Sequence, residues 1–191
     1  MNRKNLLIII TAQSLFLVFI SLLWMSIRSS EISFFDPISF LEDDIFKNMI
    51  INQDSILKGV YLGSGLFILS NIIVFLTPQL KKSLKLLDEM IIGKLETRDA
   101  FLIALLSGIS EEIFFRGILQ NGIGLIPSSI VFALLHFPSK EFLVYSLWTF
   151  LAGLFFGNIY EMTGNLFIPI VAHIINNLIA LLLWKKVKRF F

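Results

Sequence analysis

The sequence predicts an all-α fold: a polytopic membrane helical bundle of about six transmembrane helices with a polar site inside it. Of its 191 residues, 56% are hydrophobic and only 16% are charged, and the mean hydropathy is +0.82. Apolar runs of about 20 residues recur along the chain, which is the length a helix needs to cross a hydrocarbon layer of about 30 Å. A few charged residues interrupt these runs. Because a charge at the bilayer centre costs roughly 2.5 to 3.5 kcal/mol, they call for a functional explanation.

The composition also excludes several kinds of site and partner. The net charge of +2 is too small to indicate a nucleic-acid partner. Cysteine is absent, which excludes disulfide bonds, thiolate metal sites and cysteine nucleophiles. The lipid bilayer is therefore the first partner that the composition indicates.

The first half of the chain predicts two spans. The first, residues 6–27, follows a short basic start, is longer than a signal-peptide core and has no Ala-x-Ala-like cleavage site, so we expect a retained anchor. Residues 28–54 are rich in acidic and aromatic residues and are the expected outside loop. The second span, residues 56–76, ends just before Pro78.

Basic residues in the next connection predict the topology. By the positive-inside rule this connection is cytoplasmic. Six crossings place the amino terminus, this connection and the basic tail (residues 185–191) on that one side, whereas five would leave the tail outside. We therefore expect a multi-pass protein of a bacterial cell membrane with both termini in the cytoplasm. The basic residues of the connection are Lys81, Lys82, Lys85, Lys94 and Arg98.

Four further spans complete the expected bundle. The third is residues 100–119, the fifth residues 142–160 and the sixth residues 166–184. The fourth, residues 127–137, has only 11 residues, roughly 16 Å of helix. It is either re-entrant or continues past Pro138 with a kink.

No repeat or linker divides the chain into independent domains. The expected organisation is a two-span segment (residues 1–96), a core (residues 97–184) and the tail (residues 185–191). Inside the core, Gly153-x-x-x-Gly157 is a pattern of close helix packing, although two glycines by chance explain it equally well.

Few polar side chains interrupt the apolar spans of the core, and they sit at similar depths. Counted from the presumed outer ends, Glu111, His136 and His173 all lie roughly 10 to 14 Å deep. Three helices can therefore contribute to one layer. The polar set is Glu111, Glu112, Arg116, His136, His173, Asn176 and Asn177.

The two adjacent glutamates have different expected roles. Glu112 and Arg116 are four residues apart with the acid first, the favourable order for an ion pair on one helix face. Glu111 is turned about 100° away and lacks that partner, which makes it a candidate proton acceptor. Taken alone, the pair of Glu112 and Arg116 is equally consistent with a structural and a functional role. A purely structural explanation, however, leaves Glu111 without a cation inside the membrane.

The sixth span offers hydrogen-bond donors on one face. His173 and Asn177 are four residues apart and can direct two donors at one point, as a tetrahedral oxyanion requires. Asn176 borders the same face, so spacing does not choose between the asparagines. Singly, such residues are commonly interhelical hydrogen-bonding groups, and only the joint pattern favours chemistry.

Three motifs in this order resemble a known family. Glu111-Glu112-x-x-x-Arg116, Phe132-x-x-x-His136 and His173-x-x-x-Asn177 are similar to the signature of the CAAX protease and bacteriocin-processing family of intramembrane proteases, also called the abortive-infection family. The resemblance covers about residues 97–182. The first hundred residues match only in being hydrophobic spans.

The resemblance implies a glutamate-type endopeptidase acting on a peptide or a membrane-protein substrate. Glu111 with His136 would activate a water for attack on a peptide carbonyl. His173 and Asn177 would hold the oxyanion, and the ion pair of the first motif would support the site. The core is then a protease core.

We expect no cofactor, and a bound zinc ion is the alternative. Glu111, His136 and His173 with a water also form a two-histidine, one-carboxylate set of the kind that binds zinc. The sequence has no His-Glu-x-x-His motif.

Two other functions compete with proteolysis. The chain could be a non-catalytic protein of the same family, such as a bacteriocin self-immunity protein or a membrane scaffold, because a shared fold does not establish activity. A small transporter with a proton relay is the other, and the lack of an inverted repeat weighs against it.

Overall fold

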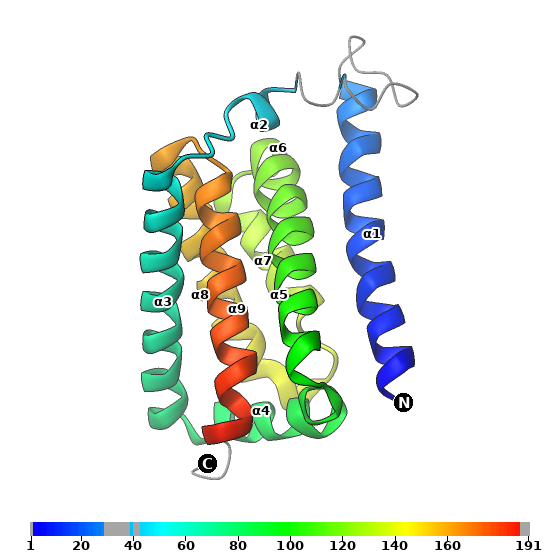
Figure 1. Ribbon diagram of the computed structural model, residues 1–191, viewed down its shortest axis with the longest axis vertical. Coiled ribbons are helices and arrows are strands. Elements are labelled where there is room, and N and C mark those ends of the chain that lie inside the picture. Colours follow the sequence, from blue (N-terminus) through cyan, green and yellow to red (C-terminus); the bar gives the residue numbers. More distant parts are fainter. Residues whose placement is uncertain (1, 29–38, 40–42, 188–191) are drawn as a thin grey trace.

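The computed structural model describes residues 2–28, 39 and 43–187, and within them it is built of helices with no strand. The all-α helical bundle is therefore confirmed. Most of the helices run along the long axis of the molecule, whereas α4 lies across one end (Figure 1). The elements are α1 (Arg3–Arg28), α2 (Asp44–Lys47), α3 (Gln53–Leu76), α4 (Pro78–Met90), η2 (Ile92–Lys94), α5 (Thr97–Glu112), η3 (Ile113–Gln120), α6 (Asn121–Ile123), α7 (Leu125–Leu135), η4 (Lys140–Phe142), α8 (Leu143–Thr163) and α9 (Phe167–Val187).

Four helical stretches of the described chain are long and apolar enough to cross a membrane. They are Arg3–Arg28, Gln53–Leu76, Lys140–Thr163 and Phe167–Trp184. Each falls within a few residues of a predicted span, and together they define an integral membrane protein. The third predicted span is also helical, through α5, η3 and α6, but it carries the charged motif.

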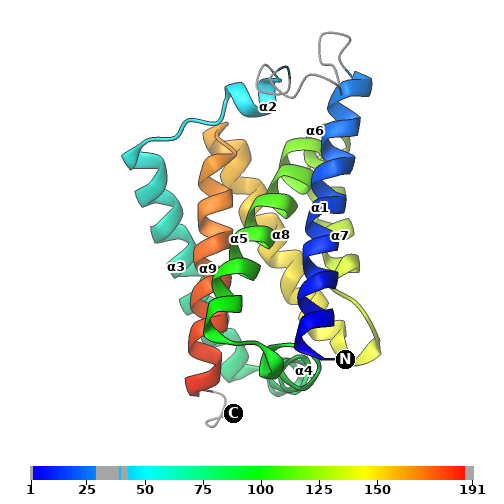
Figure 2. The ribbon, with the colours of Figure 1, turned by 45° about the vertical axis from the view of Figure 1, so that its right-hand side comes forward.

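The fourth predicted span is a short helix followed by a loop. Helix α7 ends at Leu135, and His136 is its C-cap residue. The helix does not continue through Pro138, whose ring disfavours helical backbone at the preceding residue. The chain then reaches the end of the bundle where α4 lies (Figure 2), and there the Ser83 hydroxyl donates a 2.7 Å hydrogen bond to the Glu141 carbonyl. Neither a kinked helix nor a simple re-entrant turn describes this path.

The start of α1 and the end of α9 lie at the end of the bundle where α4 lies (Figure 1), as an even number of crossings requires. Arg3 binds Asp99 through two hydrogen bonds of 2.7 and 2.8 Å, which ties α1 to α5. Trp184 Nε1 donates a 2.8 Å hydrogen bond to Asp88 Oδ1, which ties α9 to α4. The basic connection of the sequence is thus largely an amphipathic helix packed across this end.

Parts of two predicted segments fall outside the described residues. These are residues 29–38 and 40–42 of the acidic loop and residues 188–191 of the basic tail. Helix α9 runs to Val187, three residues further than the predicted end of the last span. The tail therefore begins as helix.

Glycines allow α9 to lie against the backbones of both α3 and α5. A Cβ on Gly63 of α3 would collide with the carbonyl oxygen of Ala172. A Cβ on Gly108 of α5 would lie 2.5 Å from Ile174 Cγ1 and 3.0 Å from Ile174 N. Because small residues permit close helix approach in membranes, α9 is held at short range between the two helices.

The opposite end of the bundle is closed by a hydrogen-bond cluster around Asn165. Its side chain binds both the backbone N–H (3.1 Å) and the carbonyl (2.9 Å) of Ile50, and donates to the Ser55 hydroxyl at 3.0 Å. Asn165 is buried, so these bonds satisfy its polar atoms where water is scarce. They fix the connection before α3 to the turn between α8 and α9.

Candidate active site

The first motif lies where an α-helix changes into a π-helix. Glu111 and Glu112 are the last two residues of α5, and Arg116 lies within the π-helical segment η3. In a π-helix the backbone hydrogen bonds run from residue i to i+5, and such segments occur frequently at functional sites. Nothing in the residue pattern predicted this change.

Glu112 is the centre of a buried charged cluster. Its Oε1 accepts a 3.0 Å hydrogen bond from Nη1 of Arg116 and a 2.7 Å hydrogen bond from Nδ1 of His173. The predicted ion pair of Glu112 and Arg116 is therefore confirmed, and the histidine is an additional partner. A carboxylate only accepts, so Nδ1 of His173 carries a proton and the ring orientation is fixed.

Aromatic rings and a backbone carbonyl surround the Arg116 guanidinium. Nη2 donates a 2.9 Å hydrogen bond to the carbonyl of Gly153. The guanidinium carbon lies 5.0, 5.6 and 5.9 Å from the ring centroids of Phe132, Phe156 and Phe115. Arg116 is only 2% exposed. Its charge is balanced by Glu112 and by the faces of the rings, which is how a buried cation is tolerated.

The glycine pattern of α8 marks close packing. A Cβ on Gly153 would lie 3.2 Å from Ser129 Cβ, and a Cβ on Gly157 would lie 2.5 Å from Gln120 Oε1. The carbonyl of Gly157 accepts a 3.0 Å hydrogen bond from Gln120 Nε2. Gly153 thus lets α8 approach α7, and Gly157 lets it approach η3, so close packing explains the pattern.

Glu111 faces the other nitrogen of His173. Its Oε2 lies 4.0 Å from Nε2 of His173, which is beyond hydrogen-bond distance. This oxygen is buried and has no hydrogen-bond partner among the described residues. A buried acceptor left unpaired is costly, so a hydrogen-bond donor from a bound molecule would be stabilised at this oxygen.

Phe132 connects His136 to the rest of the site. Its Nδ1 donates a 2.8 Å hydrogen bond to the Phe132 carbonyl, which leaves Nε2 as a proton acceptor. The Phe132 ring lies 4.5 Å from the His136 ring and 6.3 Å from the His173 ring, measured between centroids. The described contacts include no hydrogen bond between His136 and Glu111.

The structure separates the two asparagines of α9. Asn177 Nδ2 donates a 3.0 Å hydrogen bond to the Ser107 hydroxyl of α5, one turn before Glu111. Asn176 instead donates to Asn177 Oδ1, at 3.1 Å. Asn177 is therefore the asparagine that faces the same helix as His173, and Ser107 is a partner that the sequence did not single out.

A further site residue is Phe156, which sequence reasoning missed. Its ring stacks on His173 with 4.8 Å between centroids and 9° between planes. With 20 phenylalanines in an apolar chain, residue type offers no signal that would pick out this one.

The residues of the zinc alternative do not form a metal-binding group. Within residues 2–28, 39 and 43–187, no three His, Asp or Glu side chains gather closely enough to hold an ion. Glu111, His136 and His173 are included in that statement, and Nδ1 of His173 is already bound to Glu112.

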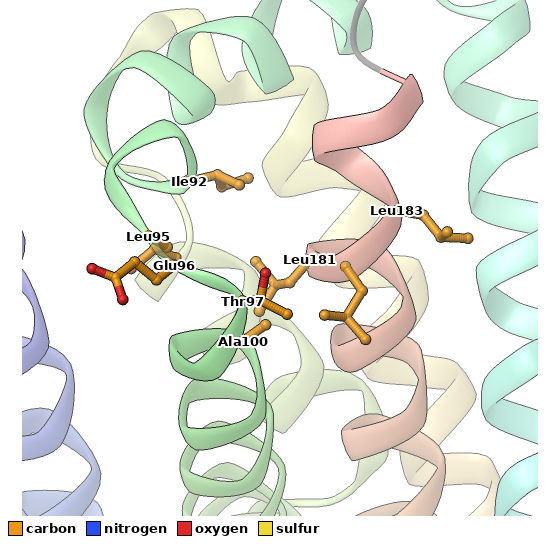
Figure 3. Close-up of a pocket in the computed structure, with 8 residues that line it drawn as sticks. Ile92, Leu95, Glu96, Thr97, Ala100, Leu181 and Leu183 are labelled. Atoms are coloured by element: carbon orange, nitrogen blue, oxygen red, sulfur yellow. The ribbon is translucent and has the colours of Figure 1, made fainter.

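A cavity of about 300 Å³ lies away from this cluster. Figure 3 shows its lining from the turn before α5, the start of α5 and the end of α9. Its charged lining residue is Glu96, which is paired with Arg3 and Arg98. The cavity holds none of the site residues, so it does not compete as the catalytic centre.

Comparisons with known proteins cover the part of the chain that holds these residues. Residues 95–179 match the family described as Type II CAAX prenyl endopeptidase Rce1-like. The match is less than half of the chain, and it contains all three motifs. The resemblance to this family of proteases is thereby confirmed over residues 95–179.

One curated relative is an uncharacterized protein, YpbD, of Bacillus subtilis (strain 168). It is 39% identical over 93 residues, which are 47% of this chain and 47% of the relative. The match thus spans about half the length of the curated relative. No solved structure matches the chain.

Proposed function

We propose that the protein is an intramembrane endopeptidase that hydrolyses a peptide bond of a peptide or membrane-protein substrate. The observation that carries the proposal is the unpartnered Oε2 of Glu111, 4.0 Å from a histidine whose other nitrogen is held by Glu112. An ionised carboxylate with a free lone pair can accept a proton from water. The family match supports the same class of reaction.

The proposed reaction begins with a water activated by Glu111 and His136. The carboxylate takes one proton while the water oxygen bonds to the peptide carbonyl carbon, and the carbonyl electrons move onto its oxygen. His136 Nε2, the free end of a ring fixed by Phe132, is the second acceptor for the water. When the carbon–nitrogen bond breaks, the proton held by Glu111 passes to the leaving nitrogen.

His173 and Asn177 are the proposed donors to the oxyanion. His173 can donate from Nε2 while Nδ1 donates to Glu112 only as an imidazolium. With Arg116, that form balances the two carboxylates of Glu111 and Glu112. Asn177 can exchange its bond to Ser107 for one to the oxyanion. Fixed donors of this kind stabilise charge that develops in the transition state.

Comparative peptidomics of membranes tests the proposal and can identify the substrate in the same experiment. Membranes carrying the wild type are compared with membranes carrying Glu111→Gln, and Glu89→Gln, an exposed acid of α4, is the matched control. We expect cleavage products with the wild type and the control and about 10² to 10⁴-fold less with Glu111→Gln. Equal product with all three proteins would overturn the proposal. Full biological effect with Glu111→Gln would favour the non-catalytic alternative.

We also propose that the end of the bundle carrying α4 is cytoplasmic, with both termini on that side. The basic residues of α4 support it through the positive-inside rule. Because the chain has no cysteine, single-cysteine labelling is unambiguous. In intact bacterial cells, an impermeant maleimide is expected to label Gln53→Cys but not Lys85→Cys. The reverse pattern would invert the topology.

A further inference from the structure

Tyr145 lies beside the water-activating histidine, on a helix that none of the three motifs includes. It is in the first turn of α8. Its ring centroid is 6.4 Å from that of His136, with the planes tilted by 56°. On another side the ring packs edge-on against Phe142, with 6.2 Å between centroids. The ring position is therefore defined from two sides.

The hydroxyl of Tyr145 has no hydrogen-bond partner among the residues that the structure describes. A buried or half-buried tyrosine hydroxyl usually finds one. Because its ring packs against the His136 ring, the phenol lies on the His136 side of the site. Within the described residues, the Tyr145 hydroxyl, Glu111 Oε2 and His136 Nε2 thus have no hydrogen-bond partner, and they come from three neighbouring helical segments.

The chemistry of the three groups differs in a useful way. The carboxylate and the histidine nitrogen accept hydrogen bonds, whereas a neutral phenol also donates. The carboxylate and the histidine nitrogen can bind the attacking water, but neither can donate a hydrogen bond to the carbonyl oxygen of the substrate. A donor beside them offers a partner to the carbonyl oxygen of the substrate.

We infer that Tyr145 is a further catalytic residue, whose O–H donates a hydrogen bond to the oxyanion formed when water attacks the peptide carbonyl. The inference rests on the proposed function. No proton is transferred from Tyr145: the bond between the water oxygen and the carbonyl carbon forms, the carbonyl electrons move to oxygen, and the phenol O–H stays intact. Tyr145 would then act from α8 while His173 and Asn177 act from α9.

Removing only the hydroxyl distinguishes this role from packing. Tyr145→Phe keeps the ring and its contacts with His136 and Phe142, and it breaks no protein hydrogen bond, so the melting temperature should equal that of the wild type. Tyr61→Phe is the matched control, because Tyr61 is 74% exposed on α3. A residue that only packs would not alter kcat through this substitution.

The test measures kcat and KM of purified wild type, Tyr145→Phe, Tyr61→Phe and Glu111→Gln on the peptide found by peptidomics. We expect kcat of Tyr145→Phe to fall about 10² to 10³-fold, as for the loss of one oxyanion donor, with KM within twofold. A peptide aldehyde, whose hydrate resembles the tetrahedral intermediate, should bind more weakly by a similar factor.

Two outcomes overturn different statements. Wild-type kcat in Tyr145→Phe, with Glu111→Gln inactive, overturns the role of Tyr145 and leaves the proposed function standing. A wild-type protein that cleaves no better than Glu111→Gln overturns the proposed function, and the inference with it.

Discussion

Nδ1 of His173 on α9 donates a 2.7 Å hydrogen bond to Oε1 of Glu112 on α5, across 61 residues of sequence. Nε2 of the same ring lies 4.0 Å from Oε2 of the neighbouring Glu111. The two adjacent glutamates therefore face opposite nitrogens of one imidazole. The Glu112 carboxylate binds Arg116 and orients the ring through Oε1, whereas Oε2 of Glu111, on the other side of the ring, has no hydrogen bond within the described residues.

This division predicts different effects of the two acids on stability. Glu112→Gln removes the charge that balances the buried Arg116, and breaking a buried pair on one side costs about 3 to 5 kcal/mol. Glu111→Gln loses no direct partner of Oε2 and should shift the free energy of unfolding by less than about 1 kcal/mol. Unfolding in detergent, followed by circular dichroism, checks both. Equal destabilisation by the two substitutions would contradict the division.

Gly108 is expected to control the distance between α5 and α9. In Gly108→Ala the new methyl meets Ile174 at its side chain and backbone nitrogen, so the helices must separate or rotate. We expect a loss of about 1 to 3 kcal/mol of stability, as for overpacking, and reduced activity because Glu112 moves from His173.

The control for Gly108 is Gly65→Ala. Gly65 is also in a helix, and a Cβ there would meet nothing within 4 Å. Alanine is the better helix former by roughly 0.5 to 1 kcal/mol, so this variant should be as stable as the wild type or more stable. Thermal unfolding and peptide cleavage are measured for both. Comparable losses in both variants would rule out a specific contact at Gly108.

Phe156 is expected to hold the His173 ring in place by stacking. Phe156→Leu keeps an apolar side chain but removes the parallel ring face and one of the rings around Arg116. We expect kcat to fall about tenfold, because an aromatic pair contributes about 0.5 to 1.5 kcal/mol beyond burial. Phe155→Leu, the neighbour that does not stack on His173, should stay within twofold of the wild type. Steady-state kinetics in detergent measures both.

The ion pair of Arg3 and Asp99 predicts a pH dependence at the α4 end of the bundle. Asp99 lies in the first turn of α5, before its apolar part, and the hydrogen bonds from Arg3 lower its pKa from 3.8 to about 2. A carboxyl whose pKa is lower in the folded state adds stability above about pH 4, and this stability is lost as the pH falls towards 2. The difference in melting temperature between wild type and Asp99→Asn should thus be largest above pH 4 and vanish near pH 2.

Asp54→Asn is the control for this titration. Asp54 also pairs with a base, Lys58, but both side chains are exposed, and such pairs contribute little. Its melting curve should follow that of the wild type throughout. Parallel pH profiles of Asp99→Asn and the wild type would show that the Arg3 pair does not couple to folding.

The sequence predicted the long helices well, because their signal is local. Apolar runs that match the membrane thickness defined α1, α3, α8 and α9 within a few residues. The ion pair of Glu112 and Arg116 also followed from spacing along one helix. These features need no knowledge of the neighbouring helices.

Contacts between helices could not be predicted in the same way. Which glutamate meets His173 depends on the rotation of α5 and on its close approach at Gly108, and neither leaves a periodic signal. The stacking of Phe156 has the same origin. The early end of α7 reflects Pro138, which the sequence marks, but the path that the chain takes afterwards depends on the contact between Ser83 and Glu141.

The number of residues in the π-helical segment η3 (Ile113–Gln120) affects how the site side chains are directed. A π-turn holds an extra residue compared with an α-turn, so a return to α-helix can absorb the deletion of one residue and keep the helix beyond the segment in register. The side chains inside the segment would still change direction, because the angle between successive residues differs between the two helix forms. A loss of one residue here would therefore produce a protein that inserts normally and whose altered side chains are confined to this segment, Arg116 among them.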